Sequence, residues 1–127
     1  MDKGKFAEAE NQYRYVVLLK PGFAMAQVNL GIALGEQGKL NEAIGHLQDA
    51  LAIDSGIFEA HFRLGAILAR RGNTDEAVTH LREAARLNPD HLQPRYLLVQ
   101  CFKSLGKYDE ADRELAIIER LLDNEAK

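Results

Sequence analysis

The chain has 127 residues and a formal net charge of −3, and its 46% hydrophobic and 28% charged content is ordinary for one globular domain. Acidic and basic residues are interspersed, so the sequence offers no basic surface of the kind that nucleic acid binding requires. No stretch approaches the roughly 20 apolar residues of a membrane span, and we therefore expect no membrane insertion.

The cysteine content and the first residues bear on location. The single cysteine, Cys101, excludes an internal disulfide framework and fits a reducing compartment. The opening segment, MDKGKFAEAE, contains no apolar leader region. We therefore expect a cytoplasmic protein, with the alternative that a leader or flanking regions were removed from a longer chain.

A repeat of 34 residues runs through the whole chain. Four kinds of residue recur at this spacing without insertion: Gly4, Gly38, Gly72 and Gly106; Glu8, Glu42, Glu76 and Glu110; Ala9, Ala43, Ala77 and Ala111; and Leu30, Leu64 and Leu98. A fixed period of this length is typical of units that bury their apolar faces against neighbouring units. We expect a single domain over residues 1–127, made of a half-repeat (1–23) and three full repeats (24–57, 58–91 and 92–125).

Each full repeat contains two segments with helical periodicity, so the pattern predicts seven helices. In chain order they cover residues 5–19, 24–37, 40–53, 58–71, 74–87, 92–105 and 108–122. Gly38 is expected to end a helix in the left-handed conformation. The recurring alanine lets two helices approach closely, and Asn73 with Glu76 is spaced as a capping box. The repeated motif is therefore predicted to be a joint between helices and not an active site.

The residues of each repeat resemble the tetratricopeptide repeat (TPR) family. The similar positions are Gln27, Leu30-Gly31, Leu34, Ala43, Leu47 and Ser55, then His61, Leu64-Gly65, Leu68, Ala77, Leu81 and Pro89. The last repeat departs from the pattern, since Val99 replaces a glycine and Asp123 a proline, which predicts looser packing there. The resemblance implies an all-α TPR-type solenoid, in which antiparallel helix hairpins stack into a right-handed superhelix.

The TPR resemblance also implies a concave groove, lined by the first helix of each hairpin, that receives a peptide. Those helices are apolar on two faces in this sequence, which independently favours such a surface. The peptide-binding candidates are Met25, Val28, Asn29, Ile32, Phe62, Arg63, Ala66, Tyr96, Leu97 and Gln100. Aromatic side chains give contact area, and amide and guanidinium groups give hydrogen bonds. The expected function is a protein–protein interaction scaffold or adaptor, with the alternative that some apolar candidates only pack between hairpins.

Two other functions stay open. The chain is alternatively a structural or oligomerising segment of a longer array, or the substrate-recruiting arm of a larger enzyme. Apolar residues on the two end helices favour self-association, and we expect a homo-oligomer if they are the contacts. They are Tyr13, Tyr15, Val16, Val17, Leu18 and Leu19 on the first helix, and Leu115, Ile117, Ile118, Leu121 and Leu122 on the last.

A carboxylate clamp for acidic peptide tails, as in TPR co-chaperones, is a poor match. Asn29 and Arg63 fall in register, but Glu59 stands where the clamp needs a lysine. A reversed charge next to the binding arginine would repel a carboxylate.

The sequence offers no catalytic or metal-binding constellation. His46 and His80 are repeat equivalents on second helices, where we expect them to be solvated. Cys101 lies on an apolar helix face and is expected to be a buried small hydrophobe. No pair of carboxylates is singled out by an apolar pocket as general acid and base. We expect no enzyme, no metal and no cofactor.

Overall fold

The computed structural model describes residues 3–126, which form seven α-helices joined by short turns. They are α1 (Lys3–Leu19), α2 (Ala24–Glu36), α3 (Leu40–Ile53), α4 (Phe58–Arg70), α5 (Thr74–Leu87), α6 (Leu92–Ser104) and α7 (Tyr108–Ala126). All seven predicted helices are present, and this part of the chain contains no strand. The largest difference is that α7 continues past the predicted end at residue 122, because no glycine or proline interrupts it.

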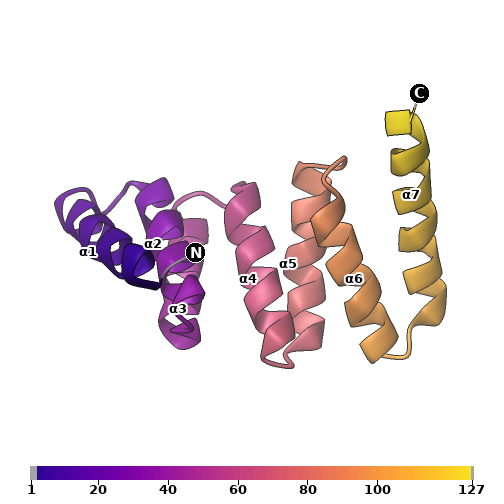
Figure 1. Ribbon diagram of the computed structural model, residues 1–127, viewed down its shortest axis with the longest axis horizontal. Helices are drawn as coiled ribbons and strands as arrows, with labels where there is room; N and C mark the ends of the chain where they lie inside the picture. The colour runs from indigo at the N-terminus through magenta and orange to yellow at the C-terminus, as the bar shows by residue number, and fades with distance from the viewer. Residues whose placement is uncertain (1–2, 127) are drawn as a thin grey trace.

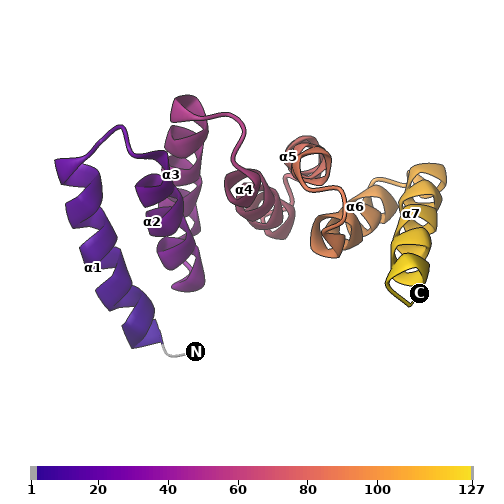
Figure 2. The same ribbon diagram turned by 90° about the horizontal axis from the view of Figure 1, so that it is seen from above.

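The helices are stacked as antiparallel hairpins along the long axis of the molecule (Figure 1). α2 pairs with α3, α4 with α5 and α6 with α7, and α1 packs against α2 at one end of the stack. The first helices of the hairpins contact one another in succession, whereas α3, α5 and α7 make no such contacts within residues 3–126. α2, α4 and α6 therefore lie on the more closely packed side of the row, which Figure 2 shows from above. This closer packing makes it the inner side of the curve.

Small residues let the two helices of a hairpin approach closely. A Cβ atom added to Gly31 would lie 2.8 Å from Cγ of Leu47, and one added to Gly65 would lie 2.7 Å from Cγ of Leu81. Both leucines are 0% exposed, and so is Ala43. The close approach predicted from the recurring alanine is confirmed, and these two glycines are required by the same contact.

The third hairpin differs from the first two in the way the sequence predicted. Val99 stands where they carry glycine, and its side chain is buried. Leu115, the counterpart of the two fully buried leucines, is only partly buried. A valine side chain fills the space that glycine leaves open, which agrees with looser packing of this hairpin.

Glycine ends the first helix of every hairpin. Gly38, Gly72 and Gly106 have φ angles of 81°, 83° and 73°, in the left-handed region that glycine adopts without a steric penalty. The predicted helix ends are thus confirmed. The capping box predicted at Asn73 is wrong, because the side chain of Asn73 makes no capping hydrogen bond to α5.

At two of its positions the recurring glutamate connects neighbouring repeats. Glu42 accepts a hydrogen bond from Arg14 at 2.9 Å, and Glu110 accepts one from Arg82 at 3.2 Å. The two arginines occupy equivalent positions of the repeat. These ion pairs are largely exposed, so each contributes about 0–1 kcal/mol and serves mainly to fix the relative placement of the hairpins.

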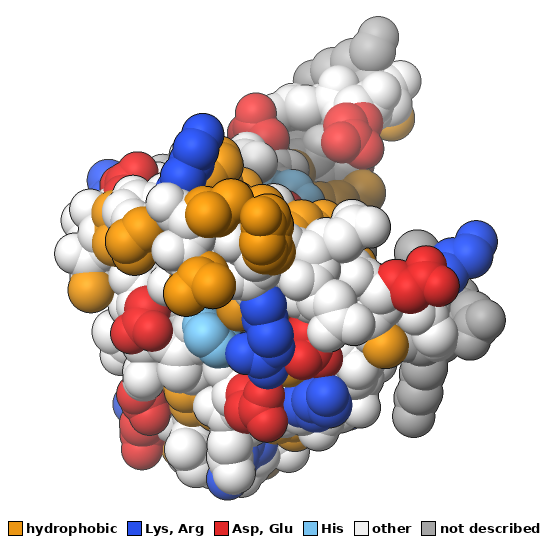
Figure 3. Space-filling view, turned by 90° about the vertical axis from the view of Figure 1, so that its left-hand side faces the viewer, with side chains coloured by type: hydrophobic (Ala, Val, Ile, Leu, Met, Phe, Trp, Pro, Cys, Tyr) orange, Lys and Arg blue, Asp and Glu red, His pale blue; other side chains and the backbone are white. Residues whose placement is uncertain are grey.

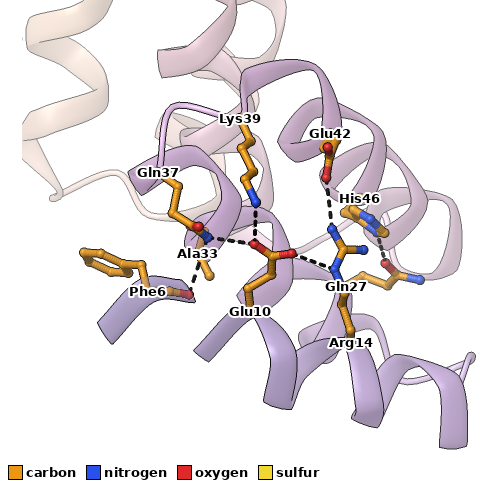
Figure 4. A network of polar contacts seen from close by, with 9 residues as sticks. All are labelled: Phe6, Glu10, Arg14, Gln27, Ala33, Gln37, Lys39, Glu42 and His46. Carbon is orange, nitrogen blue, oxygen red and sulfur yellow. Dashed lines mark hydrogen bonds and ion pairs between the residues drawn. The ribbon is translucent and has the colours of Figure 1, made fainter. Parts of the chain in front are cut away.

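A buried carboxylate fastens α1 to the rest of the stack (Figure 4). Glu10 is 8% exposed, and its oxygens accept hydrogen bonds from Arg14 at 2.7 Å, Gln37 at 2.9 Å and Lys39 at 3.0 Å. The bond from Arg14, followed by those from Gln37 and Lys39, lowers the pKa of Glu10 to about 2. Gln37 and Lys39 belong to the turn between α2 and α3, so this network sets the position of α1 beside α2.

Each hairpin carries one polar pair between equivalent positions of its two helices. The pairs are Gln27 with His46 at 2.8 Å, His61 with His80 at 3.1 Å and Arg95 with Glu114 at 3.0 Å. Both histidines predicted to be solvated, His46 and His80, are partly buried and paired instead. That expectation is wrong, because the second helices turn this position toward the first helix of the same hairpin.

Candidate functional site

A pocket opens on the inner side of the stack, between α2 and α4, with a volume of about 320 Å³. We call it the α2–α4 pocket. It is lined by Gly31, Ile32, Gly35, Glu36, Gly38, Arg63, Ala66, Ile67 and Arg70. Three of the predicted groove residues, Ile32, Arg63 and Ala66, are therefore brought together here. Ile67 is 7% exposed and forms an apolar wall.

Charged groups surround the mouth of the α2–α4 pocket. Arg63 lies 3.6 Å from Glu36 and 3.3 Å from Glu59, and its guanidinium stands over the ring of Phe62, 5.7 Å from the centroid. Arg63 is thus held by two carboxylates and one aromatic face. Arg70 also lines the pocket and is exposed, but it makes no ion pair with another residue in the described part of the chain.

A second pocket of about 190 Å³ lies between α1 and α2. It is lined by Lys5, Phe6, Ala9, Tyr13, Asn29, Ile32 and Ala33. Ile32 belongs to both pockets, so they are neighbours along the inner side of the stack. The predicted residue Asn29 is found here, within an otherwise largely apolar lining.

An aromatic cluster continues the surface toward the third hairpin. The ring centroid of Phe62 lies 5.8 Å from that of Phe58 and 5.8 Å from that of His91. Phe62 is half-buried: one part of its side chain packs against the core, and the rest is accessible to solvent. The Nδ1 atom of His91 is buried without a hydrogen-bond partner.

The remaining candidates are placed less favourably. Tyr96 and Gln100 are exposed and Leu97 packs partly against the core, but none of the three lines either of these two pockets. Met25 is 39% exposed and is likewise outside both. The prediction that Val28 lines the groove is wrong, because its side chain is 0% exposed and belongs to the hydrophobic core.

Several pocket residues were missed by sequence reasoning. Gly35 and Glu36 follow Ile32 by three and four positions and so share its helix face, which is the signal that identifies them. Phe6 and Tyr13 of α1 were not recognised as groove residues, because a half-repeat has no partner helix in the sequence to define its inner face.

Residues 3–126 contain no group of three or more His, Cys, Asp or Glu side chains arranged to hold a metal ion. Cys101 is buried as predicted, and burial raises the pKa of its thiol. None of the described helices is both long and apolar enough to cross a membrane.

A row of stacked antiparallel helix hairpins defines a helical-repeat protein. The chain belongs to the tetratricopeptide repeat family: one sequence profile of this family matches residues 1–57 and 36–91, and another matches residues 68–126. Comparison with curated proteins gives no match.

Solved structures of MamA are similar to this chain. One crystal structure of MamA is 25% identical with a TM-score of 0.87, and the match covers 94% of this chain and 70% of that one. A second MamA crystal structure has the same identity and TM-score, with 95% of this chain and 66% of that chain covered. A MamA chain from Desulfovibrio magneticus RS-1 has 17% identity and a TM-score of 0.87 over 98% of this chain and 70% of its own, which supports the fold alone.

Proposed function

We propose that this protein is an interaction scaffold that captures an extended peptide segment of a partner protein in the groove formed by α1, α2 and α4. Family membership supports the general role in protein–protein interaction. The observation that carries the groove proposal is the pair of adjoining pockets that share Ile32 on the inner side of the stack. Two adjoining, partly apolar pockets suit an extended chain segment better than a compact ligand.

The chemistry of the groove fits a peptide. Ile32, Ala66 and Phe6 offer apolar contact, and the amide of Asn29 can donate to and accept from a peptide backbone. Arg63 is already held by Glu36 and Glu59, so it is not available as the centre of a carboxylate clamp. We therefore propose recognition of an internal segment and not of a free carboxyl terminus. No catalytic step is part of this proposal.

The test is a pull-down from the lysate of the source cell with the wild type and the Phe62→Ala/Arg63→Glu double variant. A partner lost with the double variant supports groove binding. Arg113→Glu, an exposed arginine on α7, is the control for the charge change. Circular dichroism checks that helicity is retained, since Phe62 also packs on Phe58. A partner held equally by all three proteins contradicts the proposal.

Exposed apolar residues at the α1 end favour a second candidate function, self-association. Tyr15, Leu18, Leu19 and Phe23 are 64%, 78%, 62% and 49% exposed, and Figure 3 shows hydrophobic side chains gathered on this end of the molecule. Contiguous exposed apolar surface marks interaction sites in soluble proteins. Sedimentation equilibrium tests this candidate: Leu18→Glu should lower the average mass of the wild type, and a wild type that stays monomeric contradicts it.

A further inference from the structure

The α2–α4 pocket contains a glycine that the packing of the helices does not require. A Cβ atom on Gly35 would lie 3.5 Å from Cδ1 of Ile67 and 3.9 Å from Cβ of Ala43, which are ordinary van der Waals contacts. Gly31 is different, since its added Cβ would lie 2.8 Å from Leu47. Glycine is less favourable than alanine in a helix, so Gly35 weakens α2 without relieving a clash.

The repeat itself does not account for Gly35 either. The equivalent positions of the next two hairpins carry Ala69 and Lys103. What distinguishes Gly35 is its place in the pocket lining. Without a side chain there, the backbone of α2 is open to close approach beside the apolar groups of Ile32 and Ala66.

The size of the α2–α4 pocket limits what it accepts. Its volume of about 320 Å³ is at the lower end of the roughly 300–1,000 Å³ of small-molecule sites. That is suited to one large aliphatic side chain together with its own backbone. The glycine floor and the wall formed by Ile67 favour an apolar occupant.

The charges at the mouth of the pocket favour an acidic neighbour for that side chain. Both carboxylates near the pocket, Glu36 and Glu59, are already paired with Arg63. Arg70 is exposed, lines the pocket and has no ion-pair partner in residues 3–126. A free guanidinium beside an apolar slot is suited to bidentate binding of a carboxylate.

We infer that the α2–α4 pocket recognises an aliphatic residue of the partner peptide followed or preceded closely by Asp or Glu, with the aliphatic side chain over Gly35 and the carboxylate on Arg70. This inference rests on the proposed function and adds the chemical class of the ligand. It distinguishes the α2–α4 pocket from the α1–α2 pocket, whose lining contains a lysine but no arginine.

The test begins with selection of random displayed peptides on the immobilised full chain, followed by measurement of the enriched peptides by fluorescence polarisation. We expect enriched sequences to pair a Leu, Ile or Val with an acidic residue. Gly35→Leu, which fills the pocket, and Arg70→Gln should each weaken binding roughly tenfold or more. Replacing the acidic residue of the peptide by its amide should remove the effect of Arg70→Gln.

Two matched controls separate recognition from folding. Gly45→Leu introduces the same change in α3, where an added Cβ meets nothing within 4 Å. Arg71→Gln removes the neighbouring arginine, which hydrogen-bonds to Asn41 outside the pocket. Neither control should change the affinity for the enriched peptides.

The outcomes distinguish this inference from the proposed function. Enriched peptides that depend on Phe62 and Arg63 but are indifferent to Gly35→Leu and Arg70→Gln overturn the inference and leave groove binding standing. Enriched peptides that lack the pair of an aliphatic and an acidic residue also overturn the inference and leave groove binding standing. Failure to enrich any peptide overturns both.

Discussion

His61 and His80 face each other across the second hairpin, with their Nδ1 atoms 3.1 Å apart. The Nε2 atom of His61 lies 2.8 Å from the carbonyl oxygen of Ser55, which can only accept a hydrogen bond. Neutral His61 therefore carries its proton on Nε2, and His80 donates from Nδ1. Protonation of both rings would place two N–H groups against each other, so the pair accommodates one added proton but not two.

Acidification should destabilise the protein through this pair. Burial, followed by the charge of His61, lowers the pKa of His80 from its usual 6.5, while Glu76 acts in the opposite direction. A depressed folded-state pKa means that this stability is complete above about pH 6.5 and is lost as the pH falls through the lower value. We expect the free energy of unfolding, measured in urea, to decrease between about pH 7.5 and pH 5.5.

The variant His61→Gln provides the check on that prediction, because it recreates the Gln27–His46 pair of the first hairpin. Removing the second imidazole should make the decrease with falling pH smaller, since full protonation then no longer places two N–H groups against each other. If the free energy of unfolding decreases equally in the wild type and the variant, the histidine pair is not the cause of the pH dependence.

Glu10 should stabilise the protein over a different pH range from the His61–His80 pair. Its pKa is lowered from 4.5 to about 2, first by the hydrogen bond from Arg14. The contribution is therefore present above about pH 4.5 and is lost as the pH falls toward 2. Arg14 and Lys39 are partly exposed, so we expect Glu10→Gln to cost on the order of 1–3 kcal/mol at neutral pH. In urea unfolding, the difference in stability between the wild type and Glu10→Gln should be smaller at about pH 3 than at about pH 7. The control Glu119→Gln, at an exposed position of α7, should not differ from the wild type at either pH.

Cys101 should react slowly in the folded protein. Its side chain is 4% exposed, and burial raises the pKa of its thiol, so little thiolate is present and access is poor. A disulfide exchange reagent should therefore modify it at a rate that rises sharply in denaturant. Fast modification of the native protein would contradict the buried position.

The helices and turns were predictable because the signals for them are local. Gly38, Gly72 and Gly106 recur at a fixed spacing, and each has the left-handed φ that ends a helix. The same regularity identified the close contact at Ala43 and the looser third hairpin at Val99. These features depend on residues within one repeat, and the sequence contains the whole repeat.

The groove was predictable only in part, because exposure depends on neighbouring helices. Ile32 and Ala66 were found from their helix face, yet Val28 had the same apolar character and is fully buried. A helix inside a stack is covered on more than one side, so a second apolar face signals burial as readily as ligand contact. Gly35 went unnoticed because a missing side chain carries no hydrophobic signal. The partners of His80 also required the packing of the hairpin.

Two glycines of α2 should respond in opposite ways to the same substitution. Gly31→Ala places a Cβ 2.8 Å from Cγ of Leu47, which is not the flexible end of that side chain, and 3.3 Å from the carbonyl oxygen of Ala43. Because the hairpin must open to relieve this contact, we expect a loss of about 1–3 kcal/mol. Gly35→Ala meets only ordinary contacts and should gain about 0.4–1 kcal/mol, since alanine favours the helix and restricts the unfolded chain.

The comparison in urea also separates packing from recognition. Gly35→Ala should raise the urea concentration at the unfolding midpoint and weaken the binding of any peptide that lies over the α2 backbone. Gly31→Ala should lower the midpoint. If both substitutions are destabilising, Gly35 is needed for folding and its presence no longer points to a ligand. If Gly35→Ala is stabilising and leaves peptide affinity unchanged, the open backbone is not used for binding.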